Sequence, residues 1–485
     1  MPEPAAASLP RWRLAALLAG PAACALLLAL TPPAGMPPEA WRLVALAAWM
    51  VVWWLSEALP VAATALLPIL AMPLLDIEPI AEVTQNYSHP LIFLFLGGFL
   101  MAIAMQRVDL HRRLALMIVG AVGSDARRIV LGFMLATAFL SMWISNTAAT
   151  IMMFAVGLSV IDIAGAGSRD REAARRFGIA LMLGICYAAS IGGVGTLIGS
   201  PPNALLATFL SGEYGIRIDF FHWMLIGLPV VAVMLPLAWL YLTRVLLRGS
   251  PLDTAEALTA LRAELQALGP MRRAEWAVAL VFLAAAAAWV LRLPLVSLTG
   301  LPISDTAVAL AAALLLFLLP LAPAPRHFIL DWQAAKDLPW GVLLLFGGGL
   351  ALAGGFKSSG LAAWIGGAVG GVEIETWLLV LAVVAAIVFL TELTSNTAST
   401  ATFLPIMAAV AVGLGLDPRM LTVPVALGAS MAFMMPVATP PNAIVFSYEE
   451  LHLKDMAKAG IAMNLLAVAV VLAATYLLVY PFLGP

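Results

Sequence analysis

A Ser-Asn-Thr motif inside long apolar stretches constrains this chain more than any other feature of its sequence. Residues 141–150 read SMWISNTAAT, and residues 391–400, which lie 250 positions later, read TELTSNTAST. Polar groups inside apolar segments are energetically costly unless they have a role. Two copies at a fixed offset therefore predict a duplicated binding site.

The composition places both copies in a membrane. Of the 485 residues, 63% are hydrophobic and 11% are charged, whereas a soluble globular chain is roughly half apolar and roughly a quarter charged. We therefore expect an all-α polytopic protein of a lipid bilayer, the bacterial inner membrane. The net charge of −2 and the lack of a basic cluster argue against a nucleic-acid partner.

Eleven apolar stretches fit the template of a transmembrane helix, which needs about 20 residues. The first follows Arg11 and Arg13 and resembles a signal peptide, but its length and the lack of a convincing cleavage site favour a first transmembrane helix. The eleven stretches are residues 14–31, 41–57, 61–75, 90–106, 177–199, 222–247, 275–292, 303–321, 338–356, 420–438 and 459–482.

Two further apolar stretches do not fit that template, and they are the ones that carry the motifs. Residues 129–161 make 33 positions and residues 376–412 make 37, too many for one span and too few for two spans with a turn. Each length fits a re-entrant helical hairpin that dips into the membrane and returns. Such a tip is tolerated only where protein buries it or where it lines a wet cavity.

Basic residues predict the orientation of the chain by the positive-inside rule. They flank the first hairpin and fill the linker at 248–273, which we therefore place in the cytoplasm. The second hairpin is flanked only by Lys357 and Arg419, so we place its ends outside. The N-terminus is then cytoplasmic and the C-terminus external. The cytoplasmic arginines are Arg107, Arg112, Arg113, Arg127, Arg128, Arg169, Arg171, Arg175, Arg176, Arg244, Arg248, Arg262, Arg272, Arg273 and Arg326.

The repetition extends beyond the Ser-Asn-Thr motif. Gly97-Gly98 has a counterpart in Gly347-Gly348, and GSPPN at 199–203 resembles ATPPN at 438–442. Each half contains three spans, a hairpin, a span broken at Pro-Pro and a final span, so five crossings place the second half upside down. Inverted repeats with broken helices are typical of transporters. We divide the chain into an N-terminal segment with the first helix (1–40), a first repeat (41–247), the linker (248–273) and a second repeat (274–485).

The residue types at the motifs suit a cation and an anion together. Ser141 and Ser145 share one helix face, as Thr391 and Ser395 do, and hydroxyl, Asn and backbone carbonyl oxygens are ligands that Na⁺ accepts. The N–H groups that begin the returning helix attract an anion. Proline stops a helix and exposes the carbonyls before it. Such hydroxyls can also bond their own backbone or serve helix packing, but duplication of the motif favours binding.

These residues resemble the divalent anion/sodium symporters, the INDY-type dicarboxylate and citrate carriers. The resemblance covers the chain from about Trp41 and rests on the two Ser-Asn-Thr tips, on Ser141 and Thr391, and on the two Pro-Pro-Asn breaks. It implies a homodimer that works by an elevator movement. Scaffold helices would extend to about 128 and about 357, and the hairpins with the transport helices would occupy 129–247 and 376–485.

The resemblance also implies the ligands. One Na⁺ site would use Ser141, Ser145, Asn146 and the Gly199 carbonyl, and the other would use Thr391, Ser395, Asn396 and the Ala438 carbonyl. The substrate carboxylates would meet Ser145, Asn146, Thr147, Ser200, Pro201, Ser395, Asn396, Thr397, Thr439 and Pro440.

The predicted function is therefore Na⁺-coupled uptake of small dianions, foremost C4-dicarboxylates such as succinate, malate and fumarate. No Lys or Arg lies in the binding regions, so Na⁺ and helix ends must neutralise the dianion. A dicarboxylate exchanger without net Na⁺ flux and a Na⁺/sulfate symporter remain alternatives. The spans lack the nucleophile or metal arrangement of a hydrolase and the tips lack Asn-Pro-Ala, which argues against an enzyme and a passive channel. Glu392 either tunes the adjacent cation site or bonds neighbouring backbone.

Overall fold

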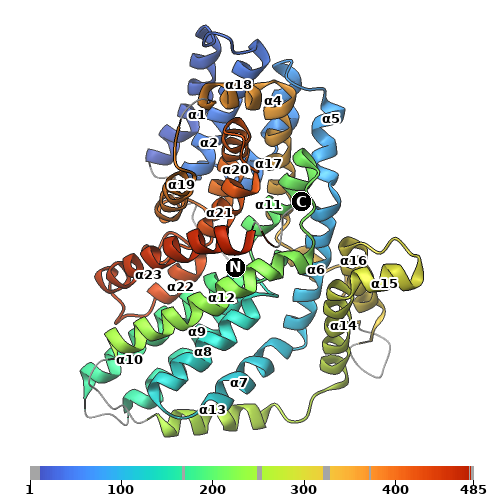
Figure 1. Ribbon diagram of the computed structural model, residues 1–485. Coiled ribbons are helices and arrows are strands. Elements are labelled where there is room, and N and C mark those ends of the chain that lie inside the picture. The colour runs from blue at the N-terminus through green and yellow to red at the C-terminus, as the bar shows by residue number, and fades with distance from the viewer. Residues whose placement is uncertain are drawn as a thin grey trace.

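The computed structural model describes residues 11–166, 170–247, 254–320, 328–370, 373–479 and 481. Residues 1–10 of the predicted N-terminal segment and residues 248–253 of the predicted linker lie outside the described part, as do Arg169 and Arg326. The described part is helical throughout and contains no strand, which confirms the predicted all-α class (Figure 1).

Helices α1 to α12 precede the linker, α13 lies within it, and α14 to α23 follow it. The helices of the first half are α1 (Arg11–Ala29), α2 (Pro38–Ser56), α3 (Val61–Thr64), α4 (Leu67–Leu74), α5 (Ile80–Gln85), α6 (Pro90–Arg107), α7 (Leu110–Val122), α8 (Ala126–Ser141), α9 (Asn146–Ala166), α10 (Arg171–Gly193), α11 (Pro201–Tyr214) and α12 (Phe220–Tyr241). They are followed by α13 (Ala255–Ala267), α14 (Arg273–Val290), α15 (Arg292–Thr299), α16 (Asp305–Leu318), α17 (Trp340–Ser358), α18 (Leu361–Val369), α19 (Thr376–Leu390), α20 (Asn396–Gly413), α21 (Arg419–Ala429), α22 (Pro440–Phe446) and α23 (Leu453–Ala474).

Nine helical segments of the described part are long and apolar enough to cross a membrane, and α9 and α20 are two of them. Several predicted spans are shorter or interrupted. The stretch 61–75 divides into α3 and α4, α16 has 14 residues, and α21 ends at Ala429. A 14-residue helix is about 21 Å long, whereas the hydrocarbon core is about 30 Å thick. These three segments therefore cross a bilayer only with the turns and extended residues beside them.

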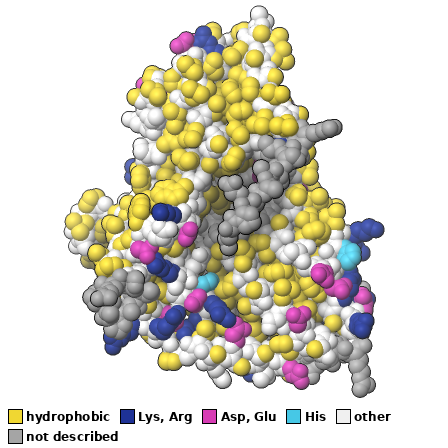
Figure 2. Space-filling view, turned by 180° about the vertical axis from the view of Figure 1, so that it is seen from behind, with side chains coloured by type: hydrophobic (Ala, Val, Ile, Leu, Met, Phe, Trp, Pro, Cys, Tyr) yellow, Lys and Arg dark blue, Asp and Glu magenta, His cyan; other side chains and the backbone are white. Residues whose placement is uncertain are grey.

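The surface is consistent with a membrane setting. Figure 2 shows hydrophobic side chains over most of the upper part of the molecule and most charged side chains gathered toward the lower part. Large apolar side chains are exposed on helices from both halves, for example Leu70, Leu283 and Leu314. Contiguous exposed apolar surface of this kind needs a lipid or protein partner.

Both predicted hairpins contain a helix break at the Ser-Asn-Thr motif. In the first, α8 ends at Ser141 and α9 begins at Asn146. In the second, α19 ends at Leu390 and α20 begins at Asn396. The break has a local cause in the first hairpin, because the Ser145 hydroxyl oxygen accepts a hydrogen bond from the Ala148 N–H at 3.2 Å. A side-chain oxygen before the first helical residue starts a new helix.

The two halves exchange partners around these hairpins. Helix α22, from the second half, packs on α9 and α10 of the first. Helix α11, from the first half, packs on α20 and α21 of the second. Figure 1 shows the resulting layout, with α8, α9, α10 and α12 side by side and α11 among α17, α20 and α21. This interleaving packs a helix of each half against the predicted hairpin of the other half.

The linker helix α13 lies beside a buried ion pair that joins the two halves. It packs on α7 and α9, and Arg113 of α7 bonds to Glu275 of α14 at 2.7 Å. The side chains of Arg113 and Glu275 are only 8% and 3% exposed. Arg113 also donates to the Gly269 carbonyl at 2.8 Å. One guanidinium thus joins α7, the segment that follows α13, and α14.

We expect Arg113→Ala to destabilise the protein by about 2 kcal/mol, because the buried Glu275 carboxylate loses one of its two guanidinium partners and keeps only Arg272 at 2.7 Å. Arg112→Ala is the matched control, since Arg112 bonds Glu264 in a pair whose side chains are 45% and 31% exposed, and its loss should cost about 1 kcal/mol or less. Thermal unfolding in detergent checks both. Equal unfolding midpoints for the two variants would contradict a stabilising role of the buried Arg113–Glu275 pair.

Candidate functional site

The first tip is organised by a buried hydroxyl. Ser141 is fully buried at the end of α8. Its Oγ lies within hydrogen-bond distance of Asn146 Oδ1 and 2.7 Å from the Ala189 carbonyl oxygen of α10. The hydroxyl, the amide oxygen and the backbone oxygen are thus gathered where α8, α9 and α10 meet.

The second tip repeats this arrangement with threonine. Thr391 is also fully buried, and its Oγ1 lies 2.6 Å from Asn396 Oδ1 and 3.0 Å from the Ala429 carbonyl oxygen of α21. The carbonyls of Ala189 and Ala429 were not predicted. Only the packing of α10 and α21 against the hairpins places them there.

Two glycines let backbone oxygens approach the first tip closely. A Cβ on Gly193 would lie 2.7 Å from Asn146 Oδ1 and 3.0 Å from the Gly199 carbonyl oxygen. A Cβ on Gly199 would lie 2.6 Å from the backbone oxygen of Gly193 and 3.0 Å from the backbone oxygen of Ser141. Any side chain at either position would therefore displace oxygens from the tip. The structure brings Ser141, Asn146 and Gly199 together as predicted and adds Gly193, which carried no sequence signal beyond a glycine-rich stretch.

The second tip is braced by Glu392. This carboxylate is 3% exposed and accepts hydrogen bonds from the N–H groups of Phe433 at 2.6 Å, Met434 at 3.0 Å and Met435 at 2.9 Å. Asn464 of α23 donates to it at 2.8 Å. Of the two roles considered from the sequence, the structure shows the bonds to neighbouring backbone.

In the first half of the chain, an uncharged side chain holds the corresponding loop. Thr196 Oγ1 donates to the Met142 carbonyl at 2.6 Å, where Met142 occupies the place of Glu392. Ala438 lies in the same loop as the residues that Glu392 holds, and its N–H donates to the Met435 carbonyl at 3.1 Å. The two tips thus have similar oxygens and unequal supports.

Helices begin at the tips with their N–H groups available to an anion. Helices α9 and α20 begin at Asn146 and Asn396. Helix α11 begins at Pro201 and Pro202, which have no backbone N–H to offer, and the Asn203 N–H bonds the Ser200 carbonyl at 3.1 Å. The predicted substrate contacts on the first turns are accessible: Asn146, Thr147, Ser395, Asn396 and Thr397 are half-buried, and Ser145 is exposed. Helix N-termini of this kind favour negative charge.

The first Pro-Pro break contacts the end of α21 in the second half. Ser200 Oγ lies 3.1 Å from Ser430 Oγ of the second half, and both residues are buried. Thr439, the counterpart of Ser200, caps α22 by accepting the Asn442 N–H at 3.2 Å, and Pro440 is exposed. Ser430 was missed by the sequence analysis because it stands outside every repeated motif.

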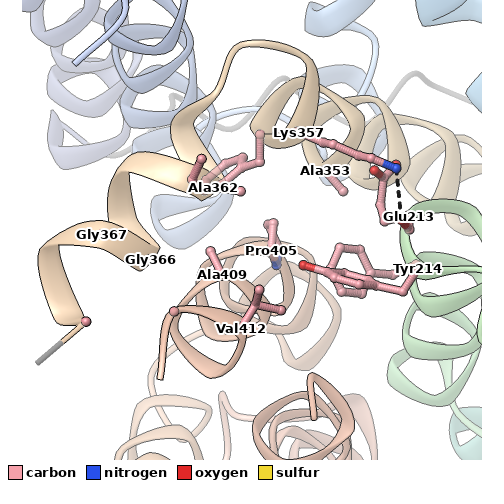
Figure 3. A pocket seen from close by; sticks show the side chains of 15 residues that line it. Glu213, Tyr214, Ala353, Lys357, Ala362, Gly366, Gly367, Pro405, Ala409 and Val412 are labelled. Carbon is pink, nitrogen blue, oxygen red and sulfur yellow. Dashed lines mark hydrogen bonds between the residues drawn. The ribbon is translucent and has the colours of Figure 1, made fainter. Parts of the chain in front are cut away.

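A cavity of about 780 Å³ lies elsewhere, between α11, α17, α18 and α20. Its walls are mostly apolar, and Glu213, Tyr214 and Lys357 gather at one end (Figure 3). Lys357 Nζ donates to the Glu213 carbonyl at 3.2 Å. None of the predicted site residues lines this cavity. A dianion there would meet one lysine beside a carboxylate, so this cavity is poorly suited to it.

Lys357→Met is expected to change the half-saturating succinate concentration by no more than about twofold, since it removes a positive charge far from the tips and leaves their oxygens in place. Uptake measured over a range of succinate concentrations checks this. A large loss of affinity would move the anion site to the cavity.

Comparisons with known proteins found similar proteins that match nearly the whole chain. A family model described as the sodium:sulfate symporter transmembrane region matches residues 11–483. The chain is 42% identical to the sodium-dependent dicarboxylate transporter SdcS of Staphylococcus saprophyticus, over 97% of this chain and 92% of that protein. It is 40% identical to SdcS of Staphylococcus aureus over the same shares.

Two solved structures share the fold. The Alcanivorax borkumensis YdaH transporter superposes with a TM-score of 0.57 at 14% identity, over 93% of this chain and all of that one. Neisseria gonorrhoeae MtrF gives a TM-score of 0.57 at 12% identity, over 95% of this chain and 98% of that one. At such identities the likeness concerns the fold alone.

Proposed function

Because this chain belongs to the sodium:sulfate symporter family, we propose that it is a secondary transporter that couples Na⁺ influx to uptake of C4-dicarboxylates. The observation that carries the proposal is the pair of tips, in which a buried hydroxyl, an Asn oxygen and a backbone carbonyl gather at Ser141–Asn146 and again at Thr391–Asn396. The SdcS relatives, named as sodium-dependent dicarboxylate transporters, support the choice of cation and anion.

The charges of the site explain why the cation is required. The hydrogen-bonded residues of both tips include no Lys or Arg, and Glu392 adds a buried acidic side chain. A dianion brought here needs positive charge, because unpaired buried charge is costly. Na⁺ at the two oxygen clusters and the helix N-termini would supply it. The Na⁺ ligands would be those named above, with the Gly193 carbonyl added at the first tip.

Ion pairs support the predicted orientation, with the N-terminus in the cytoplasm and the C-terminus outside. Pairs join segments that the sequence places on the same side. Arg107 bonds Asp331 at 2.6 Å and Arg175 bonds Asp455 at 2.9 Å, all on the predicted cytoplasmic side. The hydrogen bond from Arg107 lowers the pKa of Asp331 to about 2, so this loop carboxylate remains charged at physiological pH. On the predicted external side, Arg292 bonds Asp219 at 2.6 Å and Asp305 at 3.1 Å.

An elevator movement of a transport unit within a homodimer is the proposed mechanism. The exchange of partners between halves, α22 on α9 and α11 on α20, fits two inverted repeats that share one moving unit. That unit would contain 129–247 and 376–485, and the scaffold would contain the helices to about 128 and from 274 to about 357. About eleven spans and two re-entrant hairpins complete the proposal.

The alternatives are a dicarboxylate exchanger and a Na⁺/sulfate symporter, and competition with counterflow separates them. Liposomes that contain the protein would be given labelled succinate with Na⁺ outside, with unlabelled malate, fumarate, citrate or sulfate in excess. We expect the C4-dicarboxylates to suppress succinate uptake most. We also expect protein-containing liposomes without internal dicarboxylate to accumulate as much labelled succinate as those preloaded with succinate. Uptake only into preloaded liposomes would establish exchange, and suppression chiefly by sulfate would overturn the substrate assignment.

A further inference from the structure

The third residue of each Pro-Pro-Asn segment has a role that the predicted sites do not include. Asn203 lies in the first turn of α11 and Asn442 in the first turn of α22. Both residues are fully buried. A buried amide inside a membrane protein has to be hydrogen-bonded or it costs free energy.

Each amide closes the loop that precedes its own helix. Asn203 Nδ2 donates to the carbonyl oxygens of Gly193 at 3.0 Å and Thr196 at 2.8 Å. Asn442 Nδ2 donates to those of Ala432 at 3.2 Å and Met435 at 3.0 Å. In both cases the acceptors lie ten and seven residues before the Asn. Because carbonyls only accept, the NH₂ end of each amide has to face them.

The closed loops are the ones that carry the proposed cation carbonyls. Gly199 and Ala438 each lie four residues before the Asn and inside the loop. The Gly193 oxygen, which Asn203 holds, is itself 2.6 Å from the position of a Cβ on Gly199. The remaining amide oxygens, Asn203 Oδ1 and Asn442 Oδ1, are buried without a hydrogen-bond partner in the described part. Each amide therefore donates two hydrogen bonds while its oxygen stays buried without one. The arrangement occurs at both Asn203 and Asn442.

We infer that Asn203 and Asn442 are positioning residues that set the carbonyl geometry, and hence the cation affinity and selectivity, of the two proposed Na⁺ sites. The inference rests on the proposed function. Neither residue needs to touch the ion. The spacing and number of carbonyl oxygens decide which cation a site accepts, and a loop that loses two crosslinks cannot keep that spacing.

Four variants test this inference: Asn203→Ala, Asn203→Ser, Asn442→Ala and Asn442→Ser. Succinate uptake into proteoliposomes would be measured over a range of Na⁺ concentrations and again with Li⁺. We expect the half-saturating Na⁺ concentration to rise about tenfold or more for the alanine variants, with a changed preference between Na⁺ and Li⁺. The half-saturating succinate concentration at saturating Na⁺ should change less. The serine variants, which keep one donor, should show smaller shifts.

The matched controls remove buried hydroxyls that bond only their own helix. Thr208 of α11 bonds the Ala204 carbonyl at 2.6 Å and Thr422 of α21 bonds the Pro418 carbonyl at 2.9 Å. Thr208→Ala and Thr422→Ala should leave the Na⁺ response unchanged. A merely structural role for the asparagines would lower the amount of folded transporter and keep its Na⁺ response.

The outcomes separate this inference from the proposed function. Wild-type uptake that ignores Na⁺ would overturn the proposed function and the inference with it. Na⁺-dependent wild-type uptake with an unchanged Na⁺ response in folded Asn variants would overturn the inference alone. Failure of all four variants to fold would also overturn it, because the amides would then serve the fold.

Discussion

Alanine at Asn146 or at Asn396 is expected to abolish Na⁺-driven succinate uptake, with a loss of about a hundredfold or more. Each Asn supplies the amide oxygen that lies beside the buried hydroxyl of its tip, Ser141 in one case and Thr391 in the other. Without that oxygen the cation would lose a ligand, and the hydroxyl would lose a neighbour, inside a water-poor site. Labelled uptake into proteoliposomes measures the loss.

A suitable control is Asn86→Ala. Asn86 lies in a short turn before α6, and its Nδ2 bonds the Glu82 carbonyl at 3.3 Å, away from both tips. This variant should transport like the wild type. All three variants should elute as folded protein from gel filtration, so that a loss of uptake reports the site. Na⁺-driven uptake retained by both Asn146→Ala and Asn396→Ala would refute the assignment of the tips.

The second large effect concerns Glu392. Glu392→Gln should destabilise the protein by about 3 kcal/mol or more and should also depress uptake. The carboxylate accepts only, whereas the glutamine NH₂ group would face the donor N–H groups of either Phe433 and Met434 or Met434 and Met435. The glutamine NH₂ group and the backbone N–H groups would then face each other, with no acceptor between them. The loop that leads to Ala438 would lose its anchor.

Thermal unfolding and uptake would be recorded for Glu392→Gln beside Glu450→Gln. Glu450 is the matched control because its side chain is 56% exposed in an ion pair with Arg175, and exposed pairs contribute about 1 kcal/mol or less. A Glu392→Gln protein with the wild-type unfolding midpoint would show that the four donors do not need a charge.

Much of the site could be predicted because it is local in sequence. A Ser-Asn-Thr break in an apolar run fixes where one helix ends and the next begins, and Pro-Pro fixes where α11 and α22 begin. The glycine pairs also proved to be points of close helix approach. A Cβ on Gly97 would lie 2.7 Å from the Ala309 backbone of α16, and one on Gly348 would lie 2.4 Å from the Ala65 oxygen.

The rest depends on contacts between segments far apart in the chain. The carbonyls of Ala189 and Ala429, the contact of Ser200 with Ser430 and the donors around Glu392 arise only when α10, α21 and α23 pack on the hairpins. Apart from Ser200, none of these positions stands in a repeated motif. The spans at 61–75, 303–321 and 420–438 are predicted as longer or continuous helices, because hydropathy does not show where a membrane helix is interrupted. The orientation, the domain boundaries and the ligand sets stay predictions.

The most direct measurement is labelled succinate uptake into proteoliposomes with an inward Na⁺ gradient, and with K⁺ in its place. A Na⁺-coupled carrier concentrates succinate above its external level only while the Na⁺ gradient lasts, and it does so without internal dicarboxylate. That is the result we expect. Equal accumulation with Na⁺ and with K⁺ would contradict the account, because the two oxygen clusters at Ser141–Asn146 and Thr391–Asn396 would then hold no driving ion.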